Sequence, residues 1–117
     1  MNEITVPELY EFYLDTIQRC RSDLLHQSDE DIEYNLFEEF DVGANSFLHE
    51  DNLAKFLRFG YIDDESLELS NQLRRRWLSL QKKSWTIEEI KSNREWQELF
   101  QLCDQLFTRA QLRSKAD

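Results

Sequence analysis

The sequence predicts an all-α fold, a single-domain bundle of five to six helices spanning residues 1–117. Only two glycines and one proline occur among the 117 residues, too few for the many turns of an all-β domain. Apolar residues make up 40% of the chain and recur at spacings of three and four, as on one face of a helix. The chain has the length of one domain and can bury a core without disulfides.

The first helix is expected to begin after Thr5. Thr5 and Glu8 have the spacing of a capping box, in which each side chain satisfies a free backbone N–H of the other. Pro7 lies in the first turn, where its missing N–H has no cost. The expected inner stripe comprises Val6, Tyr10, Tyr13, Ile17, Cys20 and Leu24, widened by Leu9, Phe12, Leu14 and Leu25.

The second helix is expected to begin at Ser28, a preferred N-cap residue. The acids at 29–31 suit the positive end of the helix dipole. Gly43 is expected to end this helix, because glycine adopts the left-handed conformation of a C-terminal cap at little cost. The predicted inner face consists of Ile32, Leu36, Phe37 and Phe40.

Three or four further helices follow in the prediction, because the segment from Thr86 is either a helix of its own or the lead-in to the last one. A turn over residues 45–51 leads into a short helix that Gly60 ends, and Asp63 can cap the next one. Thr86 and Glu89 form a second capping box, with Trp85 and Ile90 as a hydrophobic staple. The last helix begins at Ser92 or Asn93, and the tail after Arg113 is expected to fray. The inner residues are Leu53, Phe56, Leu57, Leu69, Leu73, Trp77, Leu80, Trp96, Leu99, Phe100, Cys103, Leu106, Phe107 and Ala110, with Leu67 and Leu78 beside them.

Catalytic and metal-binding motifs are not recognisable in the sequence. His49-Glu50 lacks the second histidine of a helical zinc-protease motif, so His49 and His26 are expected to be surface or loop-anchoring groups. Cys20 and Cys103 lie on inner faces, as core thiols do. No catalytic residue, cofactor or metal is therefore expected, although an enzyme with a metal site at His26 or His49 remains an alternative.

The absence of long apolar runs and of a basic, then apolar N-terminal stretch indicates a cytoplasmic protein without membrane contact. We expect it to be monomeric before it binds a partner. The net charge of -10 argues against direct nucleic-acid binding, which needs clustered lysine and arginine. The basic clusters Arg74–Arg76 and Lys82–Lys83 are expected to pair with the protein's own acids.

Negative charge is concentrated in the first part of the chain. Residues 1–70 hold 18 acids and 4 bases, whereas residues 71–117 hold 6 acids and 10 bases. The acids crowd into the second helix and the turn after it. Such a surface is either a solvated face that keeps a small protein soluble or a docking face for a basic partner, which would relieve the self-repulsion and speed association.

Two segments resemble small acidic immunity proteins of bacterial contact-dependent growth inhibition systems. The first is residues 36–50, LFEEFDVGANSFLHE, and the second is residues 85–104, which ends in Trp96-x-x-Leu99-Phe100-x-Leu102-Cys103-Asp104. Within that group the chain is most similar to all-helical members paired with EndoU-type ribonuclease toxins. The resemblance implies that the chain neutralises a cognate basic nuclease domain by covering its electropositive active site.

The hypothesis for the partner-binding residues combines this resemblance with the charge pattern. The carboxylates come from Glu33, Glu38, Glu39, Asp41, Glu50 and Asp51, with Tyr34 as a rigid aromatic anchor. The main alternative is a non-catalytic cytosolic adaptor or antitoxin-like regulator of another basic protein. A nucleic-acid mimic that occupies a DNA-binding protein is another, and it requires carboxylates spaced like phosphates along a ridge.

Overall fold

Helices account for all the regular structure in residues 4–116, the residues that the computed structural model describes. The elements are α1 (Val6–Gln18), the 3-10 helix η1 (Ser22–His26), α2 (Asp29–Tyr34), the π-helix η2 (Asn35–Phe40), α3 (Asp41–Ser46), α4 (Glu50–Arg58), α5 (Asp64–Leu80), α6 (Ile87–Ser92) and α7 (Arg94–Ala116). Because α2, η2 and α3 follow one another without a break, they form one continuous rod. The described chain therefore has six main helical rods, which confirms the predicted all-α bundle.

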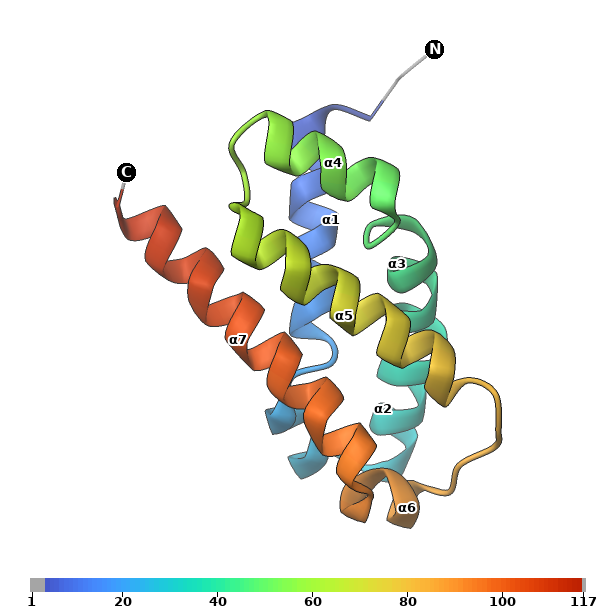
Figure 1. Ribbon diagram of the computed structural model, residues 1–117. Helices are drawn as coiled ribbons and strands as arrows, with labels where there is room; N and C mark the ends of the chain where they lie inside the picture. The colour runs from blue at the N-terminus through green and yellow to red at the C-terminus, as the bar shows by residue number, and fades with distance from the viewer. Residues whose placement is uncertain (1–3, 117) are drawn as a thin grey trace.

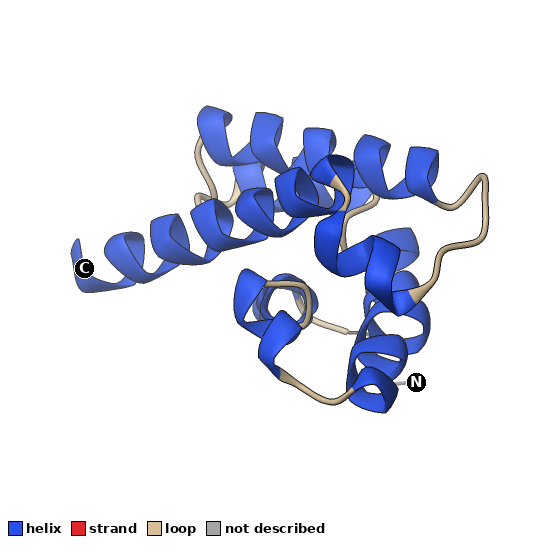
Figure 2. Ribbon diagram, turned by 90° about the horizontal axis from the view of Figure 1, so that it is seen from below, coloured by secondary structure: helices blue, strands red, loops and turns tan. Residues whose placement is uncertain are grey.

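The two longest helices, α5 and α7, pack side by side, and α1 lies behind them (Figure 1). The rod of α2, η2 and α3 flanks α1 on the side away from α7, and α4 crosses one end of α1. Figure 2 shows the same helices in a view turned by 90°, with α5 and α7 running along one layer. Within the described residues, no helix has both the length and the apolar character needed to cross a bilayer.

Helix ends follow the predicted capping residues. Both hydrogen bonds of the capping box are present at Thr5 and again at Thr86. The side chains of Ser28 and Asp63 accept backbone N–H groups at the starts of α2 and α5. Gly60 follows the end of α4, as predicted, and its φ of 80° is the left-handed conformation that glycine adopts readily after a helix.

The prediction that Gly43 ends the second helix is wrong. Gly43 lies inside α3 and is buried, and the helix continues to Ser46. The first helix is also shorter than its apolar stripe indicates, because α1 ends at Gln18 and a 3-10 turn follows. At the other end of the chain, α7 continues to Ala116. The side chains after Arg113 lie outside the described residues, so the expected fraying there stays a prediction.

The core lies between α1, α5, α7 and the rod of α2 to α3. Trp77 and Trp96 are buried in it, and so are Cys20 and Cys103, which are free thiols there, as predicted. Burial raises the pKa of the Cys20 thiol. Phe37 departs from the prediction, since 41% of its surface is exposed. It lies in η2, where the wider π-helical turn shifts residues away from the α-helical periodicity that placed Phe37 inside. Phe12 and Leu78 are exposed as well.

Candidate functional site

A shallow acidic hollow lies on the exposed face of α2 and η2. It has a volume of about 330 Å³ and is lined by Glu30, Glu33, Tyr34, Phe37 and Glu38, and we call it the acidic groove. These positions recur at helical spacing, which places them on one face of the rod. Among the described residues, the carboxylates of Glu30, Glu33 and Glu38 form no ion pair or hydrogen bond. Three carboxylates without internal partners therefore surround two exposed aromatic rings.

Tyr34 and Glu39 are joined by a hydrogen bond across the π-helix. The phenol of Tyr34 donates to Oε1 of Glu39 at 2.6 Å, a pairing five residues apart that suits the wider π-helical turn. This hydrogen bond to the carboxylate raises the pKa of Tyr34. The contact restrains an exposed ring beside the groove, and π-helical turns are frequent at functional sites.

Asp41, a predicted binding residue, is already engaged within the fold. Its carboxylate accepts hydrogen bonds from Nε1 of Trp77 at 3.2 Å and from Nδ2 of Asn45 at 3.2 Å. Nε2 of Gln81 donates to the same oxygen. These contacts connect α3 to α5 and to its C-cap residue Gln81, so Asp41 has a structural role in the fold, and its part in binding stays a prediction.

Glu50 and Asp51 occupy a second location, at the start of α4. Glu50 lies 4.0 Å from Nη2 of Arg74. The backbone N–H of Asp51 donates to Nδ1 of His49, which caps this helix. In the chain and in Figure 1, α3 lies between α2 and the start of α4. The structure therefore brings together Glu33, Tyr34, Glu38 and Glu39 but not all seven predicted residues.

A second hollow adjoins the groove through Phe37, which lines both. Its volume is also about 330 Å³, and its lining includes Phe37, Trp77, Trp85, Trp96, Lys83 and Ser84. We call it the tryptophan pocket. The ammonium of Lys83 lies 4.2 Å from the centre of the Trp85 ring. The indole N–H of Trp96 is buried and has no acceptor within the described part of the chain.

Sequence reasoning missed two contributors to these surfaces. Glu30 is counted there among the acids of the second helix but not among the binding residues, and Phe37 is assigned to the core. The spacing 30, 33, 34, 37 and 38 could have placed both on the groove face. The tryptophan pocket could not be found in this way, because its walls come from segments far apart in the sequence.

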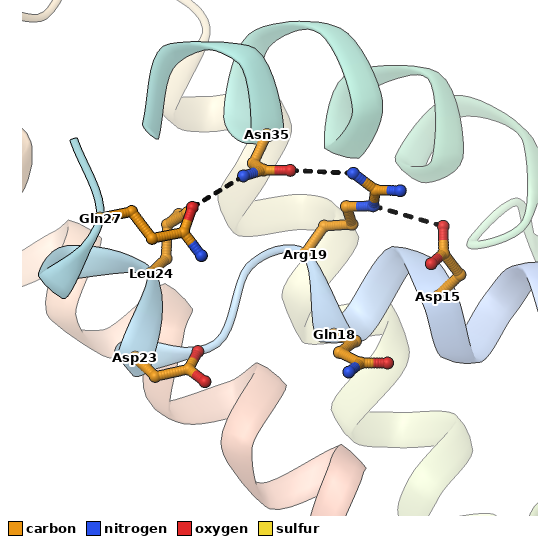
Figure 3. Close-up of a pocket in the computed structure, with 7 residues that line it drawn as sticks. All are labelled: Asp15, Gln18, Arg19, Asp23, Leu24, Gln27 and Asn35. Atoms are coloured by element: carbon orange, nitrogen blue, oxygen red, sulfur yellow. Dashed lines mark hydrogen bonds and ion pairs between the residues drawn. The ribbon is translucent and has the colours of Figure 1, made fainter. Parts of the chain in front are cut away.

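The hollow between α1, η1 and η2 is lined almost wholly by polar side chains (Figure 3). Its volume is about 390 Å³. Nη1 of Arg19 donates to Oδ1 of Asn35 at 3.0 Å, and Nδ2 of Asn35 donates to Oε1 of Gln27 at 3.0 Å. Asp15 lies 3.5 Å from Nε of Arg19. Besides amide groups and Leu24, the lining carries two carboxylates, Asp15 and Asp23, and the guanidinium of Arg19.

The histidines occupy surface positions. His26 is exposed in η1, and His49 is exposed and caps α4, which agrees with the prediction for both. Within residues 4–116, no group of three or more histidine, cysteine, aspartate or glutamate side chains has the arrangement of a metal site.

The three consecutive arginines pair with the protein's own acids, as predicted. Arg74 lies 4.0 Å from Glu50, Arg75 lies 3.4 Å from Glu68 and Arg76 lies 2.8 Å from Glu98. These pairs cancel part of the positive charge of α5. The negative field of the molecule therefore comes mainly from acids that form no such pair.

Comparison with protein-family models, curated proteins and solved structures found no match for this chain. The acidic groove and the tryptophan pocket are thus the features from which its function is inferred.

Proposed function

We propose that this chain is an immunity protein that binds and neutralises a basic nuclease toxin domain, of the ribonuclease class. The acidic groove covers the electropositive active site of the toxin. A nuclease must hold phosphates, so its cleft carries clustered lysine and arginine. The observation that supports the proposal is the set of three unpartnered carboxylates around Tyr34 and Phe37.

The charge distribution suits rapid capture of such a partner. Acids outnumber bases by 18 to 4 in residues 1–70, and the groove lies within this region. Opposite charge can raise association rate constants to about 10⁸–10⁹ M⁻¹s⁻¹ at low salt. Charge attraction alone buries little apolar surface. The exposed rings of Tyr34 and Phe37 would supply such surface, since aromatic anchors dominate many interfaces.

The resemblance to contact-dependent growth inhibition immunity proteins supports the same proposal. Its first segment, residues 36–50, includes most of η2 and so contributes Phe37 and Glu38 to the groove. Its second segment, residues 85–104, contributes Trp85 and Trp96 to the tryptophan pocket. In this proposal the protein acts in the cytoplasm and is a monomer until it meets the toxin.

Co-purification tests the proposal. The chain is expressed with the C-terminal domain of the protein encoded directly upstream, and the mixture is analysed by gel filtration at moderate salt. We expect one complex, and ribonuclease activity once the partner domain is separated from it. The absence of a complex, or a partner domain without nuclease activity, would overturn the proposal and favour the adaptor alternative.

A further inference from the structure

We propose that the tryptophan pocket receives an arginine side chain of the basic partner. This inference rests on the proposed function, because it names the group by which the toxin would be anchored. The pocket shares Phe37 with the acidic groove. A single partner segment could therefore contact the carboxylates of the groove and insert a side chain beside Phe37.

The walls of the pocket have the chemistry that binds a cation. Tryptophan is the aromatic side chain that attracts cations most strongly, and arginine is the more frequent partner. A planar guanidinium also stacks on aromatic faces, which an ammonium cannot do. Trp85 already holds a cation in the free protein, since Nζ of Lys83 lies 4.2 Å from its ring centre.

Charge complementarity specifies the occupant further. On the other side of Phe37, the carboxylates of Glu30, Glu33 and Glu38 form no internal ion pair within the described residues. Their field favours a positive segment over an acidic or neutral one. An uncharged apolar side chain would fill the pocket without using this field.

A separate observation concerns Trp96, which also lines the pocket: its buried indole N–H has no hydrogen-bond partner among the described residues. Buried donors nearly always have a partner, yet this one has none among the described residues although Trp96 is only 1% exposed. A peptide that inserts an arginine also brings backbone carbonyls, which can accept such a hydrogen bond after a small rearrangement of the wall.

Lys83 provides a sharp test, because its ammonium must leave Trp85 before a guanidinium can stack there. Replacing Lys83 by alanine removes this competitor and should tighten binding of arginine. Lys82→Ala removes the same charge from the neighbouring position, which does not line the pocket. It is the matched control for the general effect of net charge.

The experiment titrates the full chain with a Gly-Arg-Gly peptide blocked at both ends, and with the analogue in which neutral citrulline replaces arginine. NMR follows the indole N–H signals of the three tryptophans. We expect saturable shifts with the arginine peptide only, weakened about two- to fivefold by Phe37→Ala and strengthened by Lys83→Ala but not by Lys82→Ala. Equal shifts with the citrulline peptide, or equal effects of the two lysine variants, would overturn the inference.

Failure of the pocket assignment can be separated from failure of the proposed function. If the toxin complex forms but Phe37→Ala and Lys83→Ala both leave its affinity unchanged, the pocket assignment is wrong and the immunity function stands. If the arginine peptide binds specifically but no nuclease complex forms, the immunity function is wrong and the pocket assignment stands. Circular dichroism melting of each variant shows whether the fold is intact.

Discussion

Gly43 of α3 lies against Thr16 of α1 with no room for a side chain between them. A Cβ atom on Gly43 would lie 2.1 Å from Oγ1 of Thr16 and 2.6 Å from its Cγ2. Thr16 is buried, and its hydroxyl donates to the carbonyl of Phe12 at 2.8 Å. The contact therefore fixes how closely the rod that carries the acidic groove approaches α1.

Gly43→Ala should destabilise the protein, although alanine is the better helix former. Overpacking a buried contact typically costs about 1–3 kcal/mol, which exceeds the gain of roughly 1 kcal/mol in helix propensity. Urea unfolding would measure the change in the free energy of unfolding. Ser46→Ala, at an exposed position of the same helix, is the control and should change stability little. Thr16→Ala should partly rescue Gly43→Ala, and its failure to do so would contradict this account.

The sequence predicts local features of the fold well, because they depend on neighbours in the chain. The caps at Thr5, Ser28, Asp63 and Thr86 are of this kind. Gly43 could not be predicted in the same way. Its role depends on Thr16, 27 positions earlier in the chain, and a glycine that packs between helices has the same local signature as one that ends a helix.

In the candidate site, too, the sequence predicts what depends on neighbours in the chain and not what depends on contacts between distant segments. Four of the seven predicted residues lie together because they share one helical segment. Asp41 instead accepts hydrogen bonds from Trp77 of α5 and from Gln81, the C-cap of that helix. An acidic residue that binds a partner and one that ties two helices together look alike in the sequence. Phe37 was misplaced because helical periodicity assumes α-geometry, and η2 departs from it.

Tyr13 and Ser70 form a buried pair that a double-mutant cycle should resolve. Their oxygens lie 2.8 Å apart, and the Ser70 hydroxyl donates to the carbonyl of Ser66, so Tyr13 is the donor to Ser70. Burial raises the pKa of the Tyr13 phenol, which keeps it protonated. Ser70→Ala leaves this donor unpaired and should cost about 1–3 kcal/mol. Adding Tyr13→Phe should restore part of that loss in urea unfolding, and strictly additive effects would contradict the pairing.

Asp63 and Arg109 make stability depend on acid pH. Nη2 of Arg109 donates to Oδ2 of Asp63 at 2.6 Å, and this hydrogen bond, with that from the backbone of Ser66, holds the pKa of Asp63 well below its ordinary value. A lowered pKa in the folded state stabilises the fold at pH values above the unfolded pKa of about 3.9. That contribution is lost as the pH falls from there through the folded value.

Asp63→Asn tests this dependence, because asparagine still caps a helix but carries no charge. At neutral pH the variant should be less stable by about 1 kcal/mol, and its stability should converge with that of the unmodified protein well below pH 4. Urea unfolding at a series of pH values measures both. Asp64→Asn, at an adjacent exposed acid, is the control. A difference that persists undiminished into strong acid would show that Asp63 acts through something other than its charge.

Neutralising the acidic groove should weaken toxin binding more than an equal loss of charge elsewhere. The variant replaces Glu30, Glu33 and Glu38 by glutamine, and the control does the same at Glu11, Glu88 and Glu95, which are exposed and lie outside the groove. Both variants change the net charge equally, so long-range attraction falls by a similar amount in each. In the proposed complex, only the groove variant removes carboxylates from direct contact with the partner's cations.

We therefore expect the groove variant to lose at least about tenfold in affinity and much of its salt dependence, and the control to lose less than about threefold. Kinetic binding measurements at several salt concentrations would separate association from dissociation. If the groove variant associates slowly but dissociates at the normal rate, these acids only attract the partner during its approach and do not contact it in the complex. Faster dissociation as well would place them in the interface, because truncating a buried charged contact acts mainly on the dissociation rate. Equal losses of affinity in the two variants would show that the groove is not part of the binding surface.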